Sequence, residues 1–414
     1  MKNQKNSMMP ILIIGALFFI FGFITWLNGV LIPYLKIACE LNHFESYLVV
    51  FAFYISYFIM AIPSSFVLQK SGFKKGMMIG LMIMALGAVI FIPAALTRTY
   101  WMFLLGLFVL GTGLALLQTA ANPYVTIVGP IESAAKRISI MGVSNKIAGV
   151  LAPLLLSYFI MKDGDAVQAT LETLSEAAKV PFLDELAARV VIPYIFIAVS
   201  LFILAILIKF SSLPDIEEEE DEEHKQDHDS IFNYPYLFLG VIALFLYVGV
   251  EVLAADTIIS YGLWNNIPFN SAKFFTSVTL TAMIIGYFIG IATIPKYISQ
   301  NKALLISAIS GLLFSTMAIV TTSWTSVSFI ALLGLSNAIM WPAIWPLAIG
   351  GLGKYTKLGS SFLIMAVAGG AVMPLIYGML SDAFNPQLAY LINIPSYLFI
   401  LYFALSGYKV GRKI

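Results

Sequence analysis

The chain has 414 residues, of which 60% are hydrophobic and 11% are charged, and its formal net charge is +1. Soluble globular domains carry about 25% charged residues, so this composition excludes an ordinary soluble protein. The near-neutral charge, without a basic patch, gives no reason to expect a nucleic-acid partner. The single cysteine, Cys39, excludes an internal disulfide framework and a metal site built from cysteines.

Twelve apolar runs follow one another along the chain, and each is long enough to cross a bilayer as a helix. They predict an all-α membrane protein with 12 transmembrane helices. The first run is too long for the core of a signal peptide and lacks a small-residue cleavage site, so we expect it to be retained. The expected spans are residues 10–36, 46–69, 76–96, 100–127, 139–161, 190–212, 235–262, 272–295, 302–322, 325–350, 359–381 and 387–408.

The loops between these runs differ in their content of Lys and Arg. Of the 23 basic residues, 16 fall in one set of loops and termini, and six fall in the opposite set. Cytoplasmic loops carry the excess of basic residues, which predicts that both termini are cytoplasmic. Residues 163–189 form the long loop of the other side, where the segment ATLETLSEAAK has helical spacing and predicts one short surface helix.

A stretch at residues 213–234 interrupts the apolar pattern with seven consecutive acidic residues, Glu217–Glu223. Like charges at this density repel one another and stay solvated. We therefore expect an acidic cytoplasmic linker that joins two six-helix halves, residues 1–212 and 235–414. The two histidines of the same stretch are a weaker candidate for a metal site.

The two halves show a weak internal repeat. Pro123 of helix 4 corresponds to Pro342 of helix 10, and Pro153 of helix 5 corresponds to Pro374 of helix 11. Proline removes a backbone hydrogen bond and bends a helix, which a membrane tolerates only where protein or a cavity satisfies the freed groups. Paired interruptions in two repeats are typical of secondary transporters and predict a site between the halves.

Amide and aromatic side chains gather on these helices. Gln118 and Asn122 are four residues apart in helix 4, as are Asn337 and Trp341 in helix 10, so each pair shares a helix face. Amides donate and accept hydrogen bonds and tryptophan stacks on sugar rings, which favours a neutral polyhydroxylated ligand. Alternatively, the amides join helices and the tryptophan marks the membrane interface. The predicted ligand-binding residues are Asn28, Gln118, Asn122, Asn145, Asn337 and Trp341.

Three charged residues lie well inside apolar spans: Lys146 in helix 5, and Glu251 and Asp256 in helix 7. A charge at mid-bilayer costs about 2.5–3.5 kcal/mol on insertion scales, and such residues usually mark an ion or substrate pathway. Together the three carry one net negative charge, which a bound monovalent cation or one proton would neutralise. We therefore predict that all three take part in cation coupling and that the two acids are candidate metal ligands.

A structural salt bridge from Lys146 to one acid is the alternative interpretation, and it leaves the second acid unexplained. The two acids are five residues apart, about 7.5 Å of helix rise, so one ion would reach both only with local unwinding or an intervening water. None of the three histidines lies at membrane depth, which excludes a proton relay built on histidine.

Several of these segments resemble the fucose–galactose–glucose symporter family of the major facilitator superfamily. The most specific match is LLQTAANPYVTIVG at residues 116–129, which is similar to the family's L-[EQ]-x-AANP-[FY]-V-T-x-LG. Helix 1 (FFIFGFITWLNGVLIPYLK), helix 7 (YVGVE), helix 10 (WPAIWPLAI) and helix 11 (GSSFLIMAVAGG) are similar to its other motifs. The resemblance covers nearly the whole chain and implies the major facilitator fold of two six-helix halves.

The chain departs from the fucose-type pattern at two positions. Gly29 stands where the family has a helix 1 aspartate, and Gln118 stands where it has a helix 4 glutamate. In that branch these acids carry the proton, so the resemblance is closer to the sodium-dependent hexose branch. Asn145 matches the family's sugar-binding asparagine. Lys146 is outside the pattern and stands either for a second cation or for a latch between the halves.

Residues and resemblance together predict a cation-coupled symporter of a hexose such as glucose, galactose, mannose or fucose, working by alternating access as a monomer in a bacterial inner membrane. Sodium is favoured over the proton as the coupling ion, with Asp256 and Glu251 as its ligands. An uncoupled sugar uniporter is the first alternative and a drug exporter the second. We expect no enzymatic activity and no covalent cofactor, since no catalytic set or phosphate-binding loop is present in the sequence.

Overall fold

A computed structural model describes residues 8–127, 134–161, 164–211, 230–294, 296–352 and 355–412. These residues form helices, and the described part of the chain contains no strand. The first helices are α1 (Met8–Thr25), α2 (Asn28–Ala38), α3 (His43–Leu96), α4 (Tyr100–Ile127), α5 (Ala134–Ile160), α6 (Gly164–Thr173), α7 (Glu176–Ala188) and α8 (Val191–Phe210). The later elements are η2 (Ile231–Asn233), α9 (Pro235–Asp256), α10 (Ile258–Trp264), α11 (Phe269–Ala272), α12 (Phe275–Thr293), α13 (Gln300–Val320), α14 (Ser323–Asn337), α15 (Met340–Ile349), α16 (Thr356–Met365), η4 (Ala366–Ala368), α17 (Gly369–Ala383), α18 (Pro386–Ala389), η5 (Tyr390–Ile392), α19 (Asn393–Leu405) and η6 (Gly407–Lys409).

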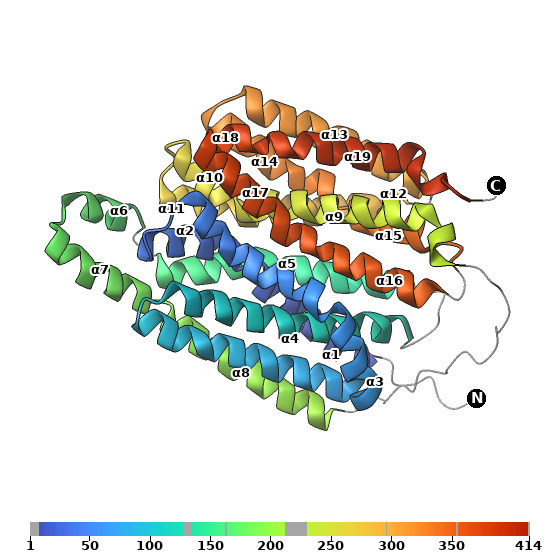
Figure 1. The fold of residues 1–414 in the computed structure, drawn as a ribbon, viewed down its shortest axis with the longest axis horizontal. Coiled ribbons are helices and arrows are strands. Elements are labelled where there is room, and N and C mark those ends of the chain that lie inside the picture. The colour runs from blue at the N-terminus through green and yellow to red at the C-terminus, as the bar shows by residue number, and fades with distance from the viewer. Residues whose placement is uncertain are drawn as a thin grey trace.

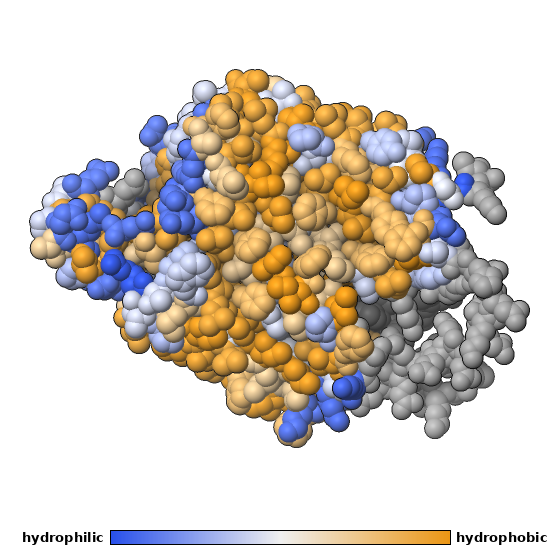
Figure 2. Space-filling model, viewed as in Figure 1, coloured by the Kyte–Doolittle hydropathy of each residue, from blue (hydrophilic) through white to orange (hydrophobic). Residues whose placement is uncertain are grey.

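Within the described residues, twelve helical segments are long and apolar enough to cross a membrane, which confirms the predicted number of spans. Helix α3 supplies two of them, because Gly72 turns the chain back with φ of 75°, a backbone conformation that favours glycine. The middle of the molecule is covered by a broad apolar band, and polar residues concentrate toward its ends (Figure 2). Exposed side chains such as Phe196, Ile203 and Leu207 of α8 belong to the surface that faces lipid.

The helices form two bundles, α1–α8 and α9–α19, which lie side by side along the long axis (Figure 1). Between them, α3 packs against α17, and α5 packs against α12. We call the end where α2 stops and α3 begins the α7 side, because α6 and α7 project from it. The opposite end, where α8 stops and α9 begins, is the linker side.

Several spans are interrupted, at places that only partly match the prolines. The first span of each bundle breaks, between α1 and α2 and again between α9 and α10. In the second bundle, α14 gives way to α15 four residues before Pro342, and η4 interrupts the eleventh span ahead of Pro374. Helices α4 and α5 continue without a break, so the predicted pairing of proline interruptions across the two halves is wrong.

Two further expectations concern the loops. The predicted single surface helix at residues 163–189 is wrong in number, because Leu174 and Ser175 separate α6 from α7. Ser175 has extended backbone and precedes the first turn of α7, so the chain leaves helical geometry at this residue. The acidic run Glu217–Glu223, with His224 and His228, lies outside the described residues, so the linker and its boundaries stay predictions.

Gly29 of α2 occupies a site that allows no side chain. A Cβ atom there would lie 2.6 Å from Thr276 Oγ1 of α12, and that hydroxyl is itself fixed by donating to the Ala255 carbonyl at 2.7 Å. We expect Gly29→Ala to lower the free energy of unfolding by about 1–3 kcal/mol through overpacking. Thermal unfolding of the purified protein checks this.

Gly142 of α5 provides the matched control. A Cβ atom at this position would meet nothing within 4 Å, so Gly142→Ala should be neutral or stabilise the helix by about 0.5–1 kcal/mol. Equal melting temperatures for the two variants would contradict the packing described around Gly29.

Candidate functional site

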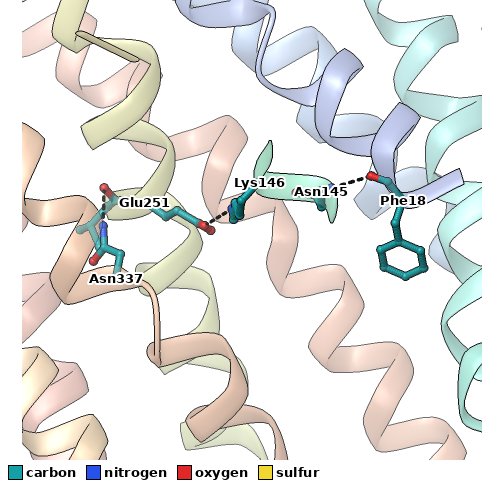
Figure 3. Close-up of polar contacts among 6 residues, drawn as sticks. Phe18, Asn145, Lys146, Glu251 and Asn337 are labelled. Atoms are coloured by element: carbon teal, nitrogen blue, oxygen red, sulfur yellow. Dashed lines mark hydrogen bonds and ion pairs between the residues drawn. The ribbon is translucent and has the colours of Figure 1, made fainter. Parts of the chain in front are cut away.

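A buried ion pair joins the two bundles inside the apolar spans that contain α5 and α9. Lys146 of α5 donates to Glu251 of α9, with 2.9 Å between Nζ and Oε1 (Figure 3). The Lys146 and Glu251 side chains are only 8% and 11% exposed. The ammonium group also lies 4.3 Å from the ring centroid of Trp26, at the interruption between α1 and α2. Three elements from both bundles therefore meet at Lys146, and the predicted salt bridge to one acid is present.

Asp256, the second acid, is in a different situation. It is fully buried at the last residue of α9, and neither carboxylate oxygen has a hydrogen-bond partner among the described residues. The carbonyls of the preceding turn do have partners: hydroxyls of Thr257, Thr276 and Thr279 donate to Leu253, Ala255 and Ala254. The backbone carbonyls at this helix break are thus hydrogen-bonded, whereas the carboxylate of Asp256 is not.

This arrangement separates the two predicted metal ligands. Glu251 already has a cationic partner, so the pair of Lys146 and Glu251 is neutral when both are ionised. The unbalanced negative charge of the membrane interior belongs to Asp256. No group of three or more His, Cys, Asp or Glu side chains close enough to hold a metal occurs in the part of the chain that the structure describes. Of the two acids, Asp256 is the one that remains open to an ion.

Two of the predicted ligand-binding amides connect helices. Asn337 of α14 is fully buried, donates to the Val250 carbonyl of α9 at 3.5 Å (Figure 3), and accepts from the Tyr397 hydroxyl at 2.8 Å. Asn28 is also buried and donates to the Thr25 carbonyl at 3.3 Å, across the break between α1 and α2. These contacts agree with the alternative interpretation that buried amides join transmembrane helices.

Three other predicted ligand-binding residues, Asn145, Gln118 and Trp341, are more accessible. Asn145 of α5 is half-buried and donates to the Phe18 carbonyl of α1 at 3.3 Å (Figure 3). Gln118 of α4 is half-buried, and the side chain of Asn122 lies outside what the structure describes. Trp341 is half-buried and stacks on Trp345, with ring centroids 5.4 Å apart, as their spacing of four predicts. These residues come from both bundles.

Two carboxylates connect the bundles on the α7 side by capping helices of the opposite bundle. Asp382, at the end of α17, accepts from the backbone N–H groups of His43 and Phe44 at 3.1 and 2.8 Å. Asp165 of α6 accepts from the N–H groups of Phe269 and Asn270 at 2.6 and 3.3 Å. A carboxylate at a helix N-terminus satisfies free N–H groups and interacts favourably with the helix dipole.

These caps were not predicted, and no local pattern in the sequence could have found them, because each joins residues more than 100 positions apart. They follow the internal repeat: Asp165 lies just after the fifth span of its half and Asp382 at the end of the fifth span of its half, and each caps the helix that opens the second span of the other half. The structure thus adds Asp165 and Asp382 to the functional candidates, together with Trp26.

Removing one cap should open the α7 side more often. We expect Asp382→Ala to raise the maleimide labelling rate of a cysteine introduced at buried Ser381 by about tenfold or more, because a hydrogen bond to a charged group contributes about 1.5–3 kcal/mol. Burial raises the pKa of the native Cys39 thiol to about 11, so this cysteine should react slowly at neutral pH and leave the signal clear.

Asp184→Ala is the control for that measurement, since Asp184 pairs with Arg98 within the first bundle at 3.2 Å. Equal labelling of Ser381→Cys with and without Asp382 would exclude a latching role for this carboxylate.

Twelve membrane spans in two bundles, with buried polar groups where the bundles meet, define the class of secondary transporters. The sequence profile of the Major Facilitator Superfamily matches residues 14–360. The chain belongs to this superfamily and is a membrane transporter, not an enzyme.

Similarity extends over nearly the full length of known sugar transporters. The chain is 35% identical to a glucose/galactose transporter of Brucella abortus over 415 residues, covering 99% of this chain and 96% of the relative. It is 34% identical to a putative glucose/galactose transporter of Helicobacter pylori, covering 95% of each chain. An L-fucose-proton symporter of Escherichia coli is 29% identical over 92% of this chain and 89% of the relative. The resemblance predicted from the motifs is confirmed.

The fold agrees with solved structures of the superfamily. The crystal structure of the transporter FucP in its outward conformation has a TM-score of 0.74 at 27% identity, covering 99% of this chain and 100% of that one. A bacterial homologue of the lysosomal transporter Spinster in an inward-facing, occupied conformation has a TM-score of 0.67 at 15% identity, which supports the fold alone. The predicted architecture of a major facilitator transporter is confirmed.

Proposed function

We propose that this protein is a cation-coupled symporter of a hexose that works by alternating access. Similarity to glucose/galactose transporters and to L-fucose-proton symporters over most of both chains supports a monosaccharide substrate. The observation that carries the coupled mechanism is Asp256, a fully buried carboxylate without a partner among the described residues, at a helix break beside the contact between the bundles. An intramembrane acid in this situation is a natural binding group for a coupling ion.

Sodium is the favoured ion. Gly29 and Gln118 stand at the two positions where the fucose-type symporters resembled by this chain have acids, so the acidic group has moved to helix 7. Gly29 packs against Thr276 and leaves no room for a carboxylate. Asp256 lies at a helix break that also carries threonine hydroxyls and backbone carbonyls, and hard cations are held by oxygen ligands of this kind. Glu251 contributes through its ion pair with Lys146.

The sugar contacts Gln118, Asn122, Asn145 and Trp341 in this proposal. The first three supply amides from helices 4 and 5, and Trp341 supplies a ring face from helix 10 for the apolar face of the sugar. Asn28 and Asn337 do not contact the sugar in this proposal. They act indirectly, because their amides hold interrupted helices in place. Both bundles thus contribute to one binding site, as alternating access requires.

The Lys146–Glu251 pair and the two carboxylate caps are the contacts that change during transport. They connect the bundles from the interior of the spans to the α7 side, and we infer from these contacts that the α7 side is closed. We place the α7 side outside the cell, from the distribution of basic residues, and the termini and acidic linker in the cytoplasm of a bacterial cell with the protein in the inner membrane. The transporter acts as a monomer of two halves, residues 1–212 and 235–414.

Purified protein in liposomes tests this function. Labelled glucose, galactose, mannose and fucose are offered under an inward sodium gradient, under a pH gradient, or under neither. We expect one of the sugars to accumulate under the sodium gradient. Accumulation under the pH gradient alone would show that the coupling ion is the proton and not sodium. Counterflow without accumulation under either gradient would show an uncoupled uniporter and reject the symport mechanism.

A further inference from the structure

The Lys146–Glu251 pair has a further partner on the helix that carries Glu251. Tyr247 lies one turn earlier on α9, and side chains four residues apart share a helix face. Tyr247 is only 1% exposed, and its hydroxyl is a hydrogen-bond partner of the Glu251 carboxylate. Glu251 is therefore held between an ammonium group of the first bundle and a phenol of the second.

The ring of Tyr247 also contacts the tryptophan that we assign to the sugar. Its centroid lies 6.4 Å from that of Trp341, with 57° between the ring planes. Trp341 follows the break between α14 and α15 and stacks on Trp345 at 5.4 Å. Trp341 is half-buried whereas Tyr247 is buried, so the tryptophan is the member of this contact that a ligand can reach. Aromatic pairs at such separations prefer particular orientations, so a ligand that reorients Trp341 changes the packing of Tyr247.

The backbone of α9 beside Glu251 is fixed by other contacts. Asn337 of α14 donates to the Val250 carbonyl at 3.5 Å, and it accepts from the Tyr397 hydroxyl at 2.8 Å. Both of these side chains are fully buried. Because the backbone is held in this way, a change at the tryptophan ring reaches the Glu251 carboxylate most directly through the side chain of Tyr247.

The first bundle contacts the same ion pair without an intermediate residue. Lys146 Nζ lies 4.3 Å from the ring centroid of Trp26, at the break between α1 and α2, where the ring face attracts the cation. Trp26 belongs to a buried cluster with Leu280 and Met283 of α12 in the second bundle. Each charge of the pair is thus joined to an aromatic ring at an interrupted span of its own bundle, directly in the first bundle and through Tyr247 in the second.

We propose that Tyr247 is a positioning residue that links sugar binding at Trp341 to the Lys146–Glu251 pair. A hexose stacked on Trp341 holds that ring against Tyr247, and the Tyr247 hydroxyl orients the Glu251 carboxylate toward Lys146. Sugar binding and the contact between the bundles then stabilise each other, and linkage requires that loss of either one weakens the other. This inference rests on the proposed sugar symport and adds to it a residue that acts through Glu251 without contacting the sugar.

Sugar binding by the purified full-length protein tests this link without any transport. The thermal unfolding midpoint is measured while glucose, galactose, mannose or fucose is titrated at constant sodium concentration, which gives an apparent dissociation constant for the sugar. Tyr247→Phe removes only the hydroxyl and should raise this constant about tenfold. The neutral-pair variant, Lys146→Met with Glu251→Gln, should raise it by a similar factor, and adding Tyr247→Phe to that variant should change it by less than about twofold. Tyr194→Phe, a buried tyrosine of α8 that stacks on Phe91 at 3.8 Å, is the matched control and should bind sugar like the wild type.

The outcomes separate this link from the proposed function. An unchanged sugar dissociation constant in Tyr247→Phe, with a lower midpoint in the absence of sugar, would show a packing role and overturn the link, while the sugar site would stand. Losses that multiply in the combined variant would show that Tyr247 binds the sugar directly, which would also overturn the link. If Tyr247→Phe does not fold, the neutral-pair variant decides: weaker sugar binding supports the link, and wild-type affinity overturns it. A wild type that responds to none of the four sugars would reject the proposed substrate class, and the link with it.

Discussion

Asp256→Asn is expected to abolish concentrative sugar uptake and to leave exchange of sugar across the membrane intact. Asparagine has nearly the same shape but no charge, so the coupling ion loses its main ligand and the sugar site remains. With one ion per sugar and a tenfold sodium gradient, the wild type can approach about tenfold accumulation, whereas the variant should stay at equal concentrations on both sides. Uptake and counterflow of labelled sugar in liposomes measure the two quantities.

A surface acid controls for the loss of a carboxylate as such. Asp184→Asn changes an exposed residue of α7 and should accumulate sugar like the wild type. Full accumulation by Asp256→Asn would mean that the coupling ion binds elsewhere. Loss of both uptake and counterflow would place Asp256 in the sugar pathway instead of the ion pathway.

The second large effect concerns the buried ion pair. Lys146→Met is expected to lower the free energy of unfolding by about 3–5 kcal/mol, because Glu251 would be left ionised and unpaired in a buried position. Adding Glu251→Gln should recover most of that loss, since two neutral side chains avoid the cost of a lone buried charge. Unfolding of the two single variants and the double variant, followed by temperature, gives the coupling between the two side chains.

An exposed ion pair within the first bundle sets the scale for this comparison. Lys179 and Glu40 are 2.8 Å apart, but their side chains are 29% and 50% exposed. Breaking that pair should cost far less than breaking the buried pair, because solvent screens charges that are exposed. Two outcomes would show that burial does not strengthen the contact between the bundles. One is an equal loss of unfolding free energy on breaking either pair, and the other is additive losses from Lys146→Met and Glu251→Gln.

The two predictions separate roles that the interior charges could have shared. Lys146 and Glu251 neutralise each other across the bundles, which suits a contact that holds one conformation. Asp256 has no such partner among the described residues, which suits a group whose charge is neutralised by an ion only during part of the cycle. Loss of stability is therefore expected from the first pair, and loss of coupling from Asp256.

The sequence by itself determined the twelve spans, because a segment that crosses lipid must be continuously apolar and must satisfy its backbone within a helix. It also identified Lys146, Glu251 and Asp256 as candidates. A charge inside such a segment is energetically costly, and it can be recognised from the sequence alone. The spacing of Trp341 and Trp345 correctly placed them on one face, since side chains four residues apart in a helix are neighbours.

Only the tertiary structure decided which charges are paired. Glu251 and Asp256 are equivalent candidates in the sequence. Packing of α5 against the second bundle places Lys146 beside Glu251, and the two form an ion pair. Packing likewise places the amide of Asn337 against α9, where it donates to a backbone carbonyl. It also places Asp382 at the start of α3, more than 300 residues away along the chain. Such contacts depend on how whole helices lie against each other, and no local pattern of residues encodes that arrangement.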